Sequence, residues 1–303
     1  MEGKKILVTG PAGHLTTPIV RELAKGNDVW GLARFSDPET RSMLEALGVT
    51  CVKKDIARDP LDDLPEDFDY VFHAGAMVAM SSEDDMAYTF EVNVQGTGRL
   101  LERCRNVKTF VLCSTGGVYQ HQTYPVTETD HYGAPIPAYG MSKIAAEQLV
   151  MFLSRLWQIP TVILRIGAVY GPDATGPLVR IQRMMRGKEV WVNPTEPREA
   201  SVMWVDDAVR LAIKAFECGQ VPPVVTNFSG DDPVSIENYC RYAGQLLGVE
   251  PKFRYTDETY PANTMDTTHM HEVLGRCEVG WREGFRRLIE AKYPDVVLRP
   301  AQT

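Results

Sequence analysis

Short apolar runs alternate with amphipathic segments through the first half of the chain, and this alternation limits the fold more than any other feature. The apolar runs occupy residues 4–10, 28–33, 49–55, 70–76, 108–114 and 160–167. Segments with helical periodicity stand between them, at residues 16–26, 41–48, 87–104 and 138–150. Buried strands that alternate with helices form a parallel sheet with helices on both faces. The sequence therefore predicts an α/β fold with a doubly wound parallel sheet.

A glycine-containing turn, "VTGPAGHLT", joins the first predicted strand to the first predicted helix. Gly10 permits a tight turn, and Gly13 lets the backbone approach a pyrophosphate that rests on the helix N-terminus. A third glycine is expected at the position of Thr16, where we expect the side chain only to pack between helix and strand. The turn indicates a dinucleotide site, although such turns also occur for purely structural reasons.

The alternation loosens after residue 172, and this change predicts two domains. A helical segment at 205–219 and an apolar run at 223–230 return to the earlier pattern. We therefore expect a dinucleotide-binding domain of residues 1–172, completed by about 201–230. Residues 173–200 and 231–303 would form a smaller, sequence-discontinuous C-terminal substrate lobe. Because ligands bind beyond the carboxyl ends of such strands, the lobe is expected to close over that edge.

The stretch "AYGMSK" places Tyr139 and Lys143 four residues apart, on one face of the helix that follows. A nearby ammonium favours the phenolate, so Lys143 is expected to lower the pKa of Tyr139 and prepare it for acid–base chemistry. The alternative is that both side chains merely cover exposed surface. His73, at a strand end, is more typical of a hydrogen-bonded histidine near a cofactor than of a base.

Arg34 follows the second predicted strand, where NAD-binding proteins usually carry a carboxylate for the ribose hydroxyls. A guanidinium there can pair with a 2′-phosphate and stack on adenine. The residue favours NADP(H), with NAD(H) as the alternative if the cofactor is selected elsewhere.

Nine motifs follow one another along the chain in the order "TGPAGHL", "KKDIARD", "DYVFHAGA", "NVQGTGRLLE", "CSTGGVY", "AYGMSKIAAEQLV", "LRIGAVYGP", "VDDAV" and "TNFSGDDPVS". In this order and approximate spacing they resemble the extended short-chain dehydrogenases/reductases of the NAD-dependent epimerase/dehydratase family. The resemblance runs from Lys5 to about Leu247. It implies a Rossmann-type fold and an NAD(P)-dependent enzyme.

The resemblance also implies which residues form the site. The catalytic residues would be Thr115, with Ser114 as the fallback hydroxyl, Tyr139 and Lys143. In hydride transfer, Tyr139 would supply a proton and Thr115 would hold the substrate oxygen, while Lys143 would bind the nicotinamide ribose. The implied cofactor-binding positions are Gly10, Gly13, His14, Leu15, Arg34, Asp55, Ile56, Ala74, Gly75, Ala76, Asn93, Tyr139, Lys143 and Ile166. A homodimer built from the helices containing Asn93 and Tyr139 is implied as well.

The sequence departs from the nucleotide-sugar enzymes of the resembled family in three motifs. Ala168 stands where those enzymes usually carry an asparagine, and Ala200 stands where an arginine usually grips the diphosphate. Arg198 is two residues away from that position. Gly116 and Gly117 replace the acidic pair of sugar dehydratases, so dehydratase activity is not expected.

Charge and cysteine usage narrow the range of partners and compartments. The net charge of −8 disfavours nucleic acid and anionic membranes as main partners. The six cysteines show no C-x-x-C pair, and the histidines lack metal-ligand spacing, so we expect reduced thiols and no metal site. No signal-peptide core or membrane-length apolar run is evident, which favours a cytoplasmic protein.

Three functions are compatible with these residues. The leading hypothesis is an NAD(P)-dependent oxidoreductase that interconverts an alcohol and a carbonyl on a small molecule other than a nucleotide sugar. The alternative is a nucleotide-sugar 4-epimerase, which uses the same three residues and retains NAD. The third is a non-catalytic nucleotide-sensing protein on the same fold, for which the proton donor Tyr139 would be unnecessary.

Overall fold

The computed structural model describes residues 1–78, 84–132, 138–173 and 176–300, which form two compact units. Unit one comprises Met1–Gln120, His131–Ile166 and Val209–Thr226. Unit two comprises His121–Asp130, Gly167–Ala208 and Asn227–Thr303. Unit two therefore takes more of the chain than the expected lobe, because the short strand that follows residue 167 pairs within unit two and not with the large sheet.

A seven-stranded sheet forms the centre of unit one, in the order β10-β6-β5-β4-β1-β2-β3. The pairings from β6 through β3 are parallel. The strands are β1 (Lys5–Thr9), β2 (Asp28–Ala33), β3 (Thr50–Lys53), β4 (Tyr70–His73), β5 (Thr109–Thr115), β6 (Thr161–Ile166) and β10 (Val224–Phe228). The doubly wound α/β fold predicted from the alternation of strands and helices is confirmed.

The sheet strands are apolar on both faces because helices cover both. Ile6, Leu7 and Val8 of β1 are completely buried, as are Phe110 and its two successors in β5. Such strands read as continuous apolar runs in the sequence, because no face is left for water. This explains why their positions were predictable.

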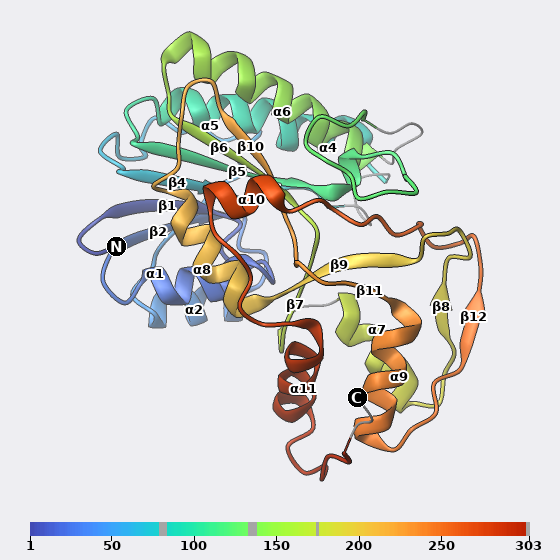
Figure 1. Ribbon diagram of the computed structural model, residues 1–303. Helices are drawn as coiled ribbons and strands as arrows, with labels where there is room; N and C mark the ends of the chain where they lie inside the picture. Colours follow the sequence, from blue (N-terminus) through green and yellow to red (C-terminus); the bar gives the residue numbers. More distant parts are fainter. Residues whose placement is uncertain (79–83, 133–137, 174–175, 301–303) are drawn as a thin grey trace. The chain divides into compact units, whose positions relative to one another are not determined.

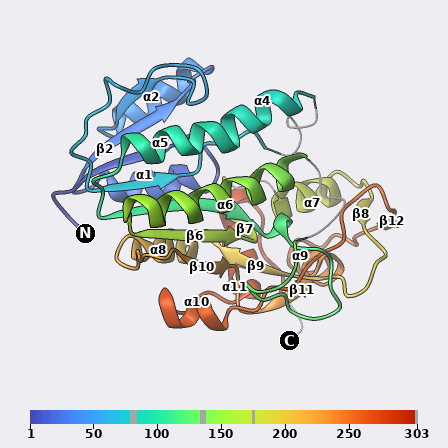
Figure 2. The same cartoon turned by 90° about the horizontal axis from the view of Figure 1, so that it is seen from above.

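The helices of unit one lie in two layers (Figure 1). On one face run α5 (Thr97–Arg103) and α6 (Ala138–Trp157), which Figure 2 shows side by side. On the other lie α1 (Thr16–Leu23) and α2 (Pro38–Ala46). A short helix, α4 (Met86–Phe90), continues into a π-helix, η1 (Glu91–Gly96), and then into α5, while Gly116–Val118 form a 3-10 turn, η2.

Unit two contains two small sheets and several helices. Its sheets have the orders β11-β9-β7 and β12-β8. The strands are β7 (Ala168–Tyr170), β8 (Val190–Val192), β9 (Glu199–Trp204), β11 (Pro233–Ser235) and β12 (Phe253–Tyr255), and the helices are α7 (Gly176–Met185), α9 (Ile236–Leu247), α10 (Thr268–Val273) and α11 (Trp281–Lys292). Phe285 stacks between Tyr170 and Tyr239, with ring centroids 4.5 and 4.6 Å away. The remaining helix, α8 (Val205–Ala215), begins in unit two and ends in unit one.

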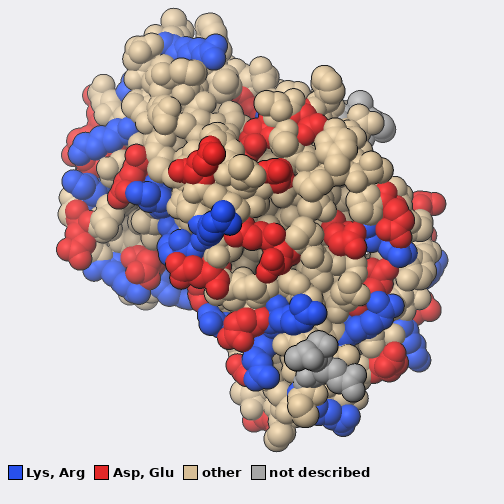
Figure 3. All heavy atoms as spheres, viewed as in Figure 1, with Lys and Arg blue, Asp and Glu red and all other residues tan. Residues whose placement is uncertain are grey.

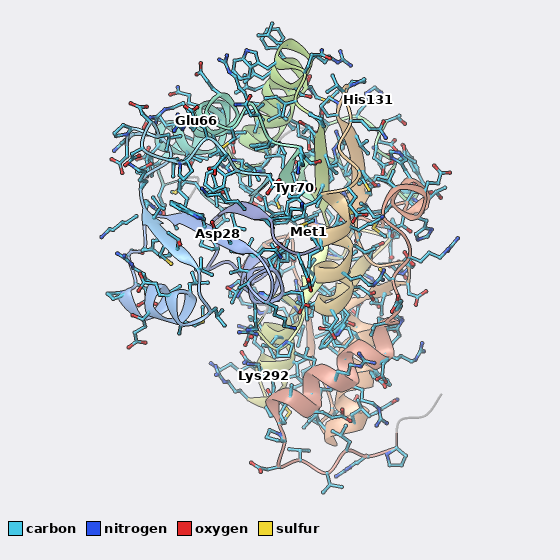
Figure 4. The ribbon with its side chains drawn as sticks, turned by 90° about the vertical axis from the view of Figure 1, so that its left-hand side faces the viewer. Met1, Asp28, Glu66, Tyr70, His131 and Lys292 are labelled. Atoms are coloured by element: carbon cyan, nitrogen blue, oxygen red, sulfur yellow. The ribbon has the colours of Figure 1, made fainter. Side chains whose placement is uncertain are left out.

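Figures 3 and 4 show the charged side chains of one face and the edge at which the strands of unit one begin. Acidic and basic side chains are interspersed over the face shown in Figure 3. Figure 4 labels Asp28 and Tyr70, which begin β2 and β4, near Met1, so this is the edge at which these parallel strands start. The carboxyl ends of the same strands lie at the opposite edge. Within the described part of the chain, no helix is both long and apolar enough to span a membrane.

Candidate active site

The glycine-containing turn follows β1 and leads into α1. Gly10 has a φ of +62°, and a Cβ on it would lie 2.9 Å from the Cα of Gly75, so only glycine fits. Leu15, at the N-cap of α1, makes no side-chain capping bond, which leaves this helix end suited to an anion. The turn therefore fits a pyrophosphate by its backbone.

Thr16, in the place of a third glycine, does more than pack. Its Oγ1 lies 2.5 Å from the carbonyl oxygen of Gly10 and 3.2 Å from that of Gly13, and it donates its proton to this pair. The side chain is 2% exposed. Thr16 therefore closes the turn by hydrogen bonding, which corrects the expectation of a purely packing role.

A cavity of about 280 Å³ opens in unit one beside this turn. Its walls come from the ends of β1 and β2, from the segments that follow β1, β2, β3 and β4, and from α2, α4 and η1. The lining residues are Thr9, Gly10, Ala12, Leu32, Ala33, Arg34, Phe35, Ser36, Asp37, Thr40, Lys54, Asp55, Ile56, Gly75, Ala76, Met77, Tyr88 and Val92.

Six of the expected cofactor positions share this cavity, namely Gly10, Arg34, Asp55, Ile56, Gly75 and Ala76. The others do not line it, namely Gly13, His14, Leu15, Ala74, Asn93, Tyr139, Lys143 and Ile166. The structure thus brings six of the expected cofactor positions together around one cavity.

Asp55 is held at the cavity by an aromatic residue that the sequence did not single out. The hydroxyl of Tyr88, on α4, donates to Asp55 Oδ2 at 2.5 Å and accepts from Arg34 Nη1 at 3.3 Å. The guanidinium of Arg58 lies 4.5 Å from the Tyr88 ring centroid. Partial burial acts to raise the pKa of Asp55, but the bonds from Tyr88 and the Ala57 amide and the nearby arginines outweigh it, so the pKa is lowered. Asp55 is therefore a carboxylate at neutral pH.

Asp37 is a second residue that the sequence analysis missed. It lines the cavity three residues after Arg34, because Phe35 adopts a φ of +45° and turns the chain back. Its carboxylate caps α2, accepting from the Glu39 amide at 3.0 Å and the Thr40 hydroxyl at 2.6 Å. The Asp-Pro pair that opens α2 was the available signal. Asp37 thus places a carboxylate at this cavity, in the turn that follows β2.

His73, at the end of β4, is enclosed between two hydroxyl groups. Its Nδ1 lies 2.6 Å from Thr9 Oγ1, and its Nε2 lies 2.7 Å from Thr97 Oγ1. Burial, with a contribution from Lys143, lowers its pKa to about 3. The ring is neutral at physiological pH, and both of its nitrogens are used within the protein.

The three expected catalytic residues come from the end of β5 and the start of α6. The Thr115 hydroxyl lies close enough to the Tyr139 phenol to lower its pKa, and Thr115 Oγ1 accepts from the Gly117 amide at 3.1 Å. Lys143 is 2% exposed, one helical turn after Tyr139. Ser114, the fallback hydroxyl, is buried and donates to Glu147, so it does not share the position of Thr115.

Burial dominates the protonation of both Tyr139 and Lys143. The pKa of Tyr139 is raised to about 12 by burial and by Cys113, and the bond from Thr115 offsets this only in part. Burial lowers the pKa of Lys143, against the opposing effects of Cys113 and Glu147. The expected depression of the Tyr139 pKa by Lys143 is therefore wrong for the protein alone, because desolvation disfavours both charges.

Asn93 joins the segment after β4 to α6. Its Oδ1 accepts from the Met77 amide at 2.8 Å, and its Nδ2 donates to the Met77 carbonyl at 3.0 Å. Nδ2 also lies 2.8 Å from Ser142 Oγ, which donates to the Tyr139 carbonyl at 2.7 Å. The π-helix that carries Asn93 thus supports the helix turn that carries Tyr139.

Two of the residues that depart from nucleotide-sugar enzymes, Ala168 and Ala200, lie in unit two, whereas Gly116 and Gly117 lie in unit one. Ala168 is in β7 and Ala200 is in β9. The guanidinium of Arg198 is already paired, 2.7 Å from Glu196 Oε1 and 3.3 Å from Glu237 Oε1. Arg198 therefore does not present a free cation in this arrangement.

Comparisons with known proteins agree with the geometry. The model of the NAD dependent epimerase/dehydratase family matches residues 6–226. An uncharacterized UDP-glucose epimerase of Bacillus subtilis is 33% identical over 86% of this chain and 88% of its own length. The UDP-glucose 4-epimerase of Mycolicibacterium smegmatis is 28% identical over 94% of this chain and 97% of its own. Among solved structures, MoeE5 in complex with UDP-glucuronic acid and NAD has a TM-score of 0.82 at 26% identity, covering 96% of this chain and 100% of MoeE5.

Proposed function

We propose that this chain, which belongs to the NAD-dependent epimerase/dehydratase family, is a UDP-sugar 4-epimerase that retains NAD. This replaces the leading sequence-based hypothesis of an oxidoreductase for other small molecules. Two relatives that match it along most of their length are named UDP-glucose epimerases. The observation that carries the proposal is the proximity of the Thr115 hydroxyl to the buried Tyr139 phenol, with Lys143 one helical turn away on the same face of α6. That arrangement suits reversible hydride transfer at an alcohol carbon.

The roles of the three residues follow from the charge that develops on the substrate oxygen. The nicotinamide ring, when bound, supplies the hydride chemistry. Tyr139 would take the proton of the sugar hydroxyl during oxidation and return it to the same oxygen during reduction. Thr115 would donate a hydrogen bond to that oxygen, and Lys143 would hold the cofactor ribose. The hydride would pass to bound NAD and be given back to the opposite face, which would invert the carbon without net consumption of cofactor.

We also propose NAD(H) as the cofactor, in place of the NADP(H) that Arg34 favoured. The Arg34 guanidinium is engaged with the Tyr88 hydroxyl, and the carboxylate of Asp37 lines the same cavity. A carboxylate there suits ribose hydroxyls and repels a 2′-phosphate. The solved structure of MoeE5 also contains NAD.

The cofactor assignment can be tested at Asp37 without losing the helix cap. Asn replaces Asp well at an N-cap, so Asp37→Asn should preserve α2 and weaken NAD binding more than NADP binding. Arg34→Ala is the matched variant for the opposite assignment. Calorimetric titration of each emptied variant with NADH and with NADPH measures its affinity for the two cofactors. Selective loss of NADPH binding in Arg34→Ala would restore the NADP(H) assignment.

The epimerase proposal is tested first by native mass spectrometry of the purified protein. We expect NAD to remain bound, and calorimetry of the emptied protein should show UDP-glucose binding once NAD is restored. NMR should then detect conversion of UDP-glucose to UDP-galactose without added cofactor. Tyr139→Phe is the control for a contaminating epimerase. Absence of both binding and conversion would refute the proposal.

One observation favours a second candidate, a dehydrogenase or reductase of another small alcohol or carbonyl compound. Ala168 and Ala200 remove two polar side chains, and Arg198 is already paired with Glu237. A buried diphosphate without polar partners is costly. Loose, exchangeable cofactor binding with no UDP-glucose binding would favour this candidate.

A further inference from the structure

A buried ion pair lies in unit one, one helical turn beyond Lys143. The side chains of Arg165, on β6, and Glu147, on α6, are 5% and 1% exposed. Arg165 Nη2 lies 2.8 Å from Glu147 Oε2, and Arg165 Nε lies 3.2 Å from each carboxylate oxygen. Arg165 also donates to the hydroxyls of Tyr119 and Tyr132, at 3.0 and 3.1 Å. Several N–H groups of the Arg165 guanidinium therefore have hydrogen-bond acceptors inside the protein.

Stability alone does not explain such a pair. Removing two charges from water costs several kcal/mol per ion, and their attraction often only balances that cost. Well-packed apolar residues of the same volume are frequently as stable. Unlike apolar residues, the planar guanidinium fixes the orientation of its hydrogen-bond partners.

The partners of this pair are next to the candidate catalytic residues in the chain. Ser114 donates to Glu147 and directly precedes Thr115 on β5. Ser114 is also the register partner of Arg165 across the β5–β6 ladder. Glu147 follows Tyr139 and Lys143 at intervals of four residues on α6, so all three lie along one helix face. One network therefore ties the strand that carries Thr115 to the helix that carries Tyr139.

We propose that Glu147 and Arg165 are positioning residues, which hold the Thr115 hydroxyl in register with the Tyr139 phenol. This proposal rests on the proposed function for the roles of Thr115 and Tyr139. It concerns geometry, since neither member of the pair donates to Tyr139 or Thr115 in the hydrogen bonds described above. A displacement of about 1 Å at a catalytic group is enough to cost roughly 100-fold in turnover.

The charge of Glu147 has a second effect at the same site. Lys143 is buried among Cys113 on β5, His73 on β4 and Glu147 on its own helix, with Tyr139 one turn away. Burial lowers the pKa of Lys143, and Glu147 opposes this. Glu147 therefore supports the ammonium of Lys143 as well as the geometry.

The test uses a double variant, Glu147→Gln with Arg165→Met, in the full-length protein. Removing both charges avoids leaving one buried ion without a partner. Tyrosine labelled with ¹³C at Cζ reports the approach of the Thr115 hydroxyl to the Tyr139 phenol through the chemical shift of the Tyr139 signal. Tyr139→Phe assigns that signal, and Thr115→Val shows its position when the Thr115 hydroxyl is absent. We expect the double variant to move the signal toward that of Thr115→Val.

Turnover and cofactor binding give a second readout. We expect kcat with UDP-glucose to fall about 10- to 100-fold in the double variant, with KM and the NAD Kd within about twofold. Glu102→Gln is the matched control, because Glu102 pairs with Arg105 at 2.8 Å on the surface. It should leave the NMR signal and kcat unchanged.

The outcomes separate the two proposals. A folded double variant whose Tyr139 signal and kcat equal those of the wild type would overturn the positioning role. If the double variant does not fold, Arg165→Lys, which keeps the charge and loses the fork, decides by the same signal. A Tyr139→Phe variant with normal turnover would instead refute the proposed function, while the NMR result still decides the positioning role.

Discussion

Substitution of Tyr139 is the most direct test of the proposed chemistry. Phenylalanine keeps the ring and removes only the hydroxyl that Thr115 contacts. Tyr139→Phe should reduce kcat by about two to four orders of magnitude, which is the usual contribution of a positioned acid or base. NAD affinity should change little, because the phenol oxygen contributes to the reaction more than to binding. Steady-state kinetics and calorimetry measure the two effects, and near-normal kcat would exclude the assigned role.

His73 makes a pH-dependent contribution to stability. Its pKa is near 6.5 in the unfolded chain and about 3 in the fold, so protonation favours unfolding. The contribution is complete above about pH 6.5 and is lost as the pH falls toward 3. Between pH 7.5 and 5.0 the wild type should lose about 2 kcal/mol through this residue.

Urea unfolding at both pH values measures this loss, with His73→Gln as the reference. Glutamine does not titrate, so the difference between the two proteins isolates the histidine from carboxyl groups common to both. Equal pH dependence in the two proteins would show that His73 is not buried as a neutral ring.

Sequence patterns identified some residues of the candidate site and missed others. Thr115 and Ser114 are adjacent hydroxyl residues, and only the alternation of β5 shows that Ser114 turns to Glu147 while Thr115 contacts Tyr139. Asp37 and Tyr88 were missed because a left-handed residue and a distant helix bring them to the cavity. Side chains assembled by such turns leave no local pattern in the sequence.

Among the secondary-structure elements, the glycine-containing turn supports a prediction with an internal control. Gly10 and Gly48 both have positive φ, but a Cβ meets Gly75 only at Gly10, and nothing lies within 4 Å at Gly48. Gly48→Ala should cost about 1 kcal/mol through backbone strain alone. Gly10→Ala should cost at least about 2 kcal/mol more, because β1 and the segment after β4 must move apart. Urea unfolding compares them, and equal losses would show that the close approach is unimportant.

The strands and helices of unit one were more predictable than those of unit two. Strands buried on both faces are apolar runs of recognisable length, as β5 and β6 illustrate. By contrast, β7 and β11 are three residues long, and β11 pairs with β9 across a long stretch of chain. Strands this short carry no periodicity, so their pairing depends on tertiary contacts.

At the scale of the whole molecule, the exposed face of α6 predicts the oligomeric state. Phe152 and Leu156 are 61% and 58% exposed, and Met141 lies on the same helical face at 44%. We propose that this stripe packs against a second copy, as the family resemblance implied. Phe152→Glu with Leu156→Glu should convert a dimer to a monomer in light scattering.

Val297→Glu is the control for this dimer prediction. Val297 is 90% exposed in unit two, away from α6 in the sequence, and its substitution should leave the dimer intact. A wild-type protein that is monomeric at micromolar concentration would contradict the proposal directly.

The crossing of the chain between its two units has a consequence for its synthesis. The chain passes from one unit to the other after residues 120, 130, 166, 208 and 226. The sheet of unit one therefore stays incomplete until β10 leaves the ribosome. Until then β6 is an unpaired edge strand, although its residues Val162, Ile163 and Leu164 are fully buried in the folded protein. Unpaired apolar edges recruit other strands. We therefore expect a growing chain of this design to be most prone to aggregation between the synthesis of β6 and that of β10.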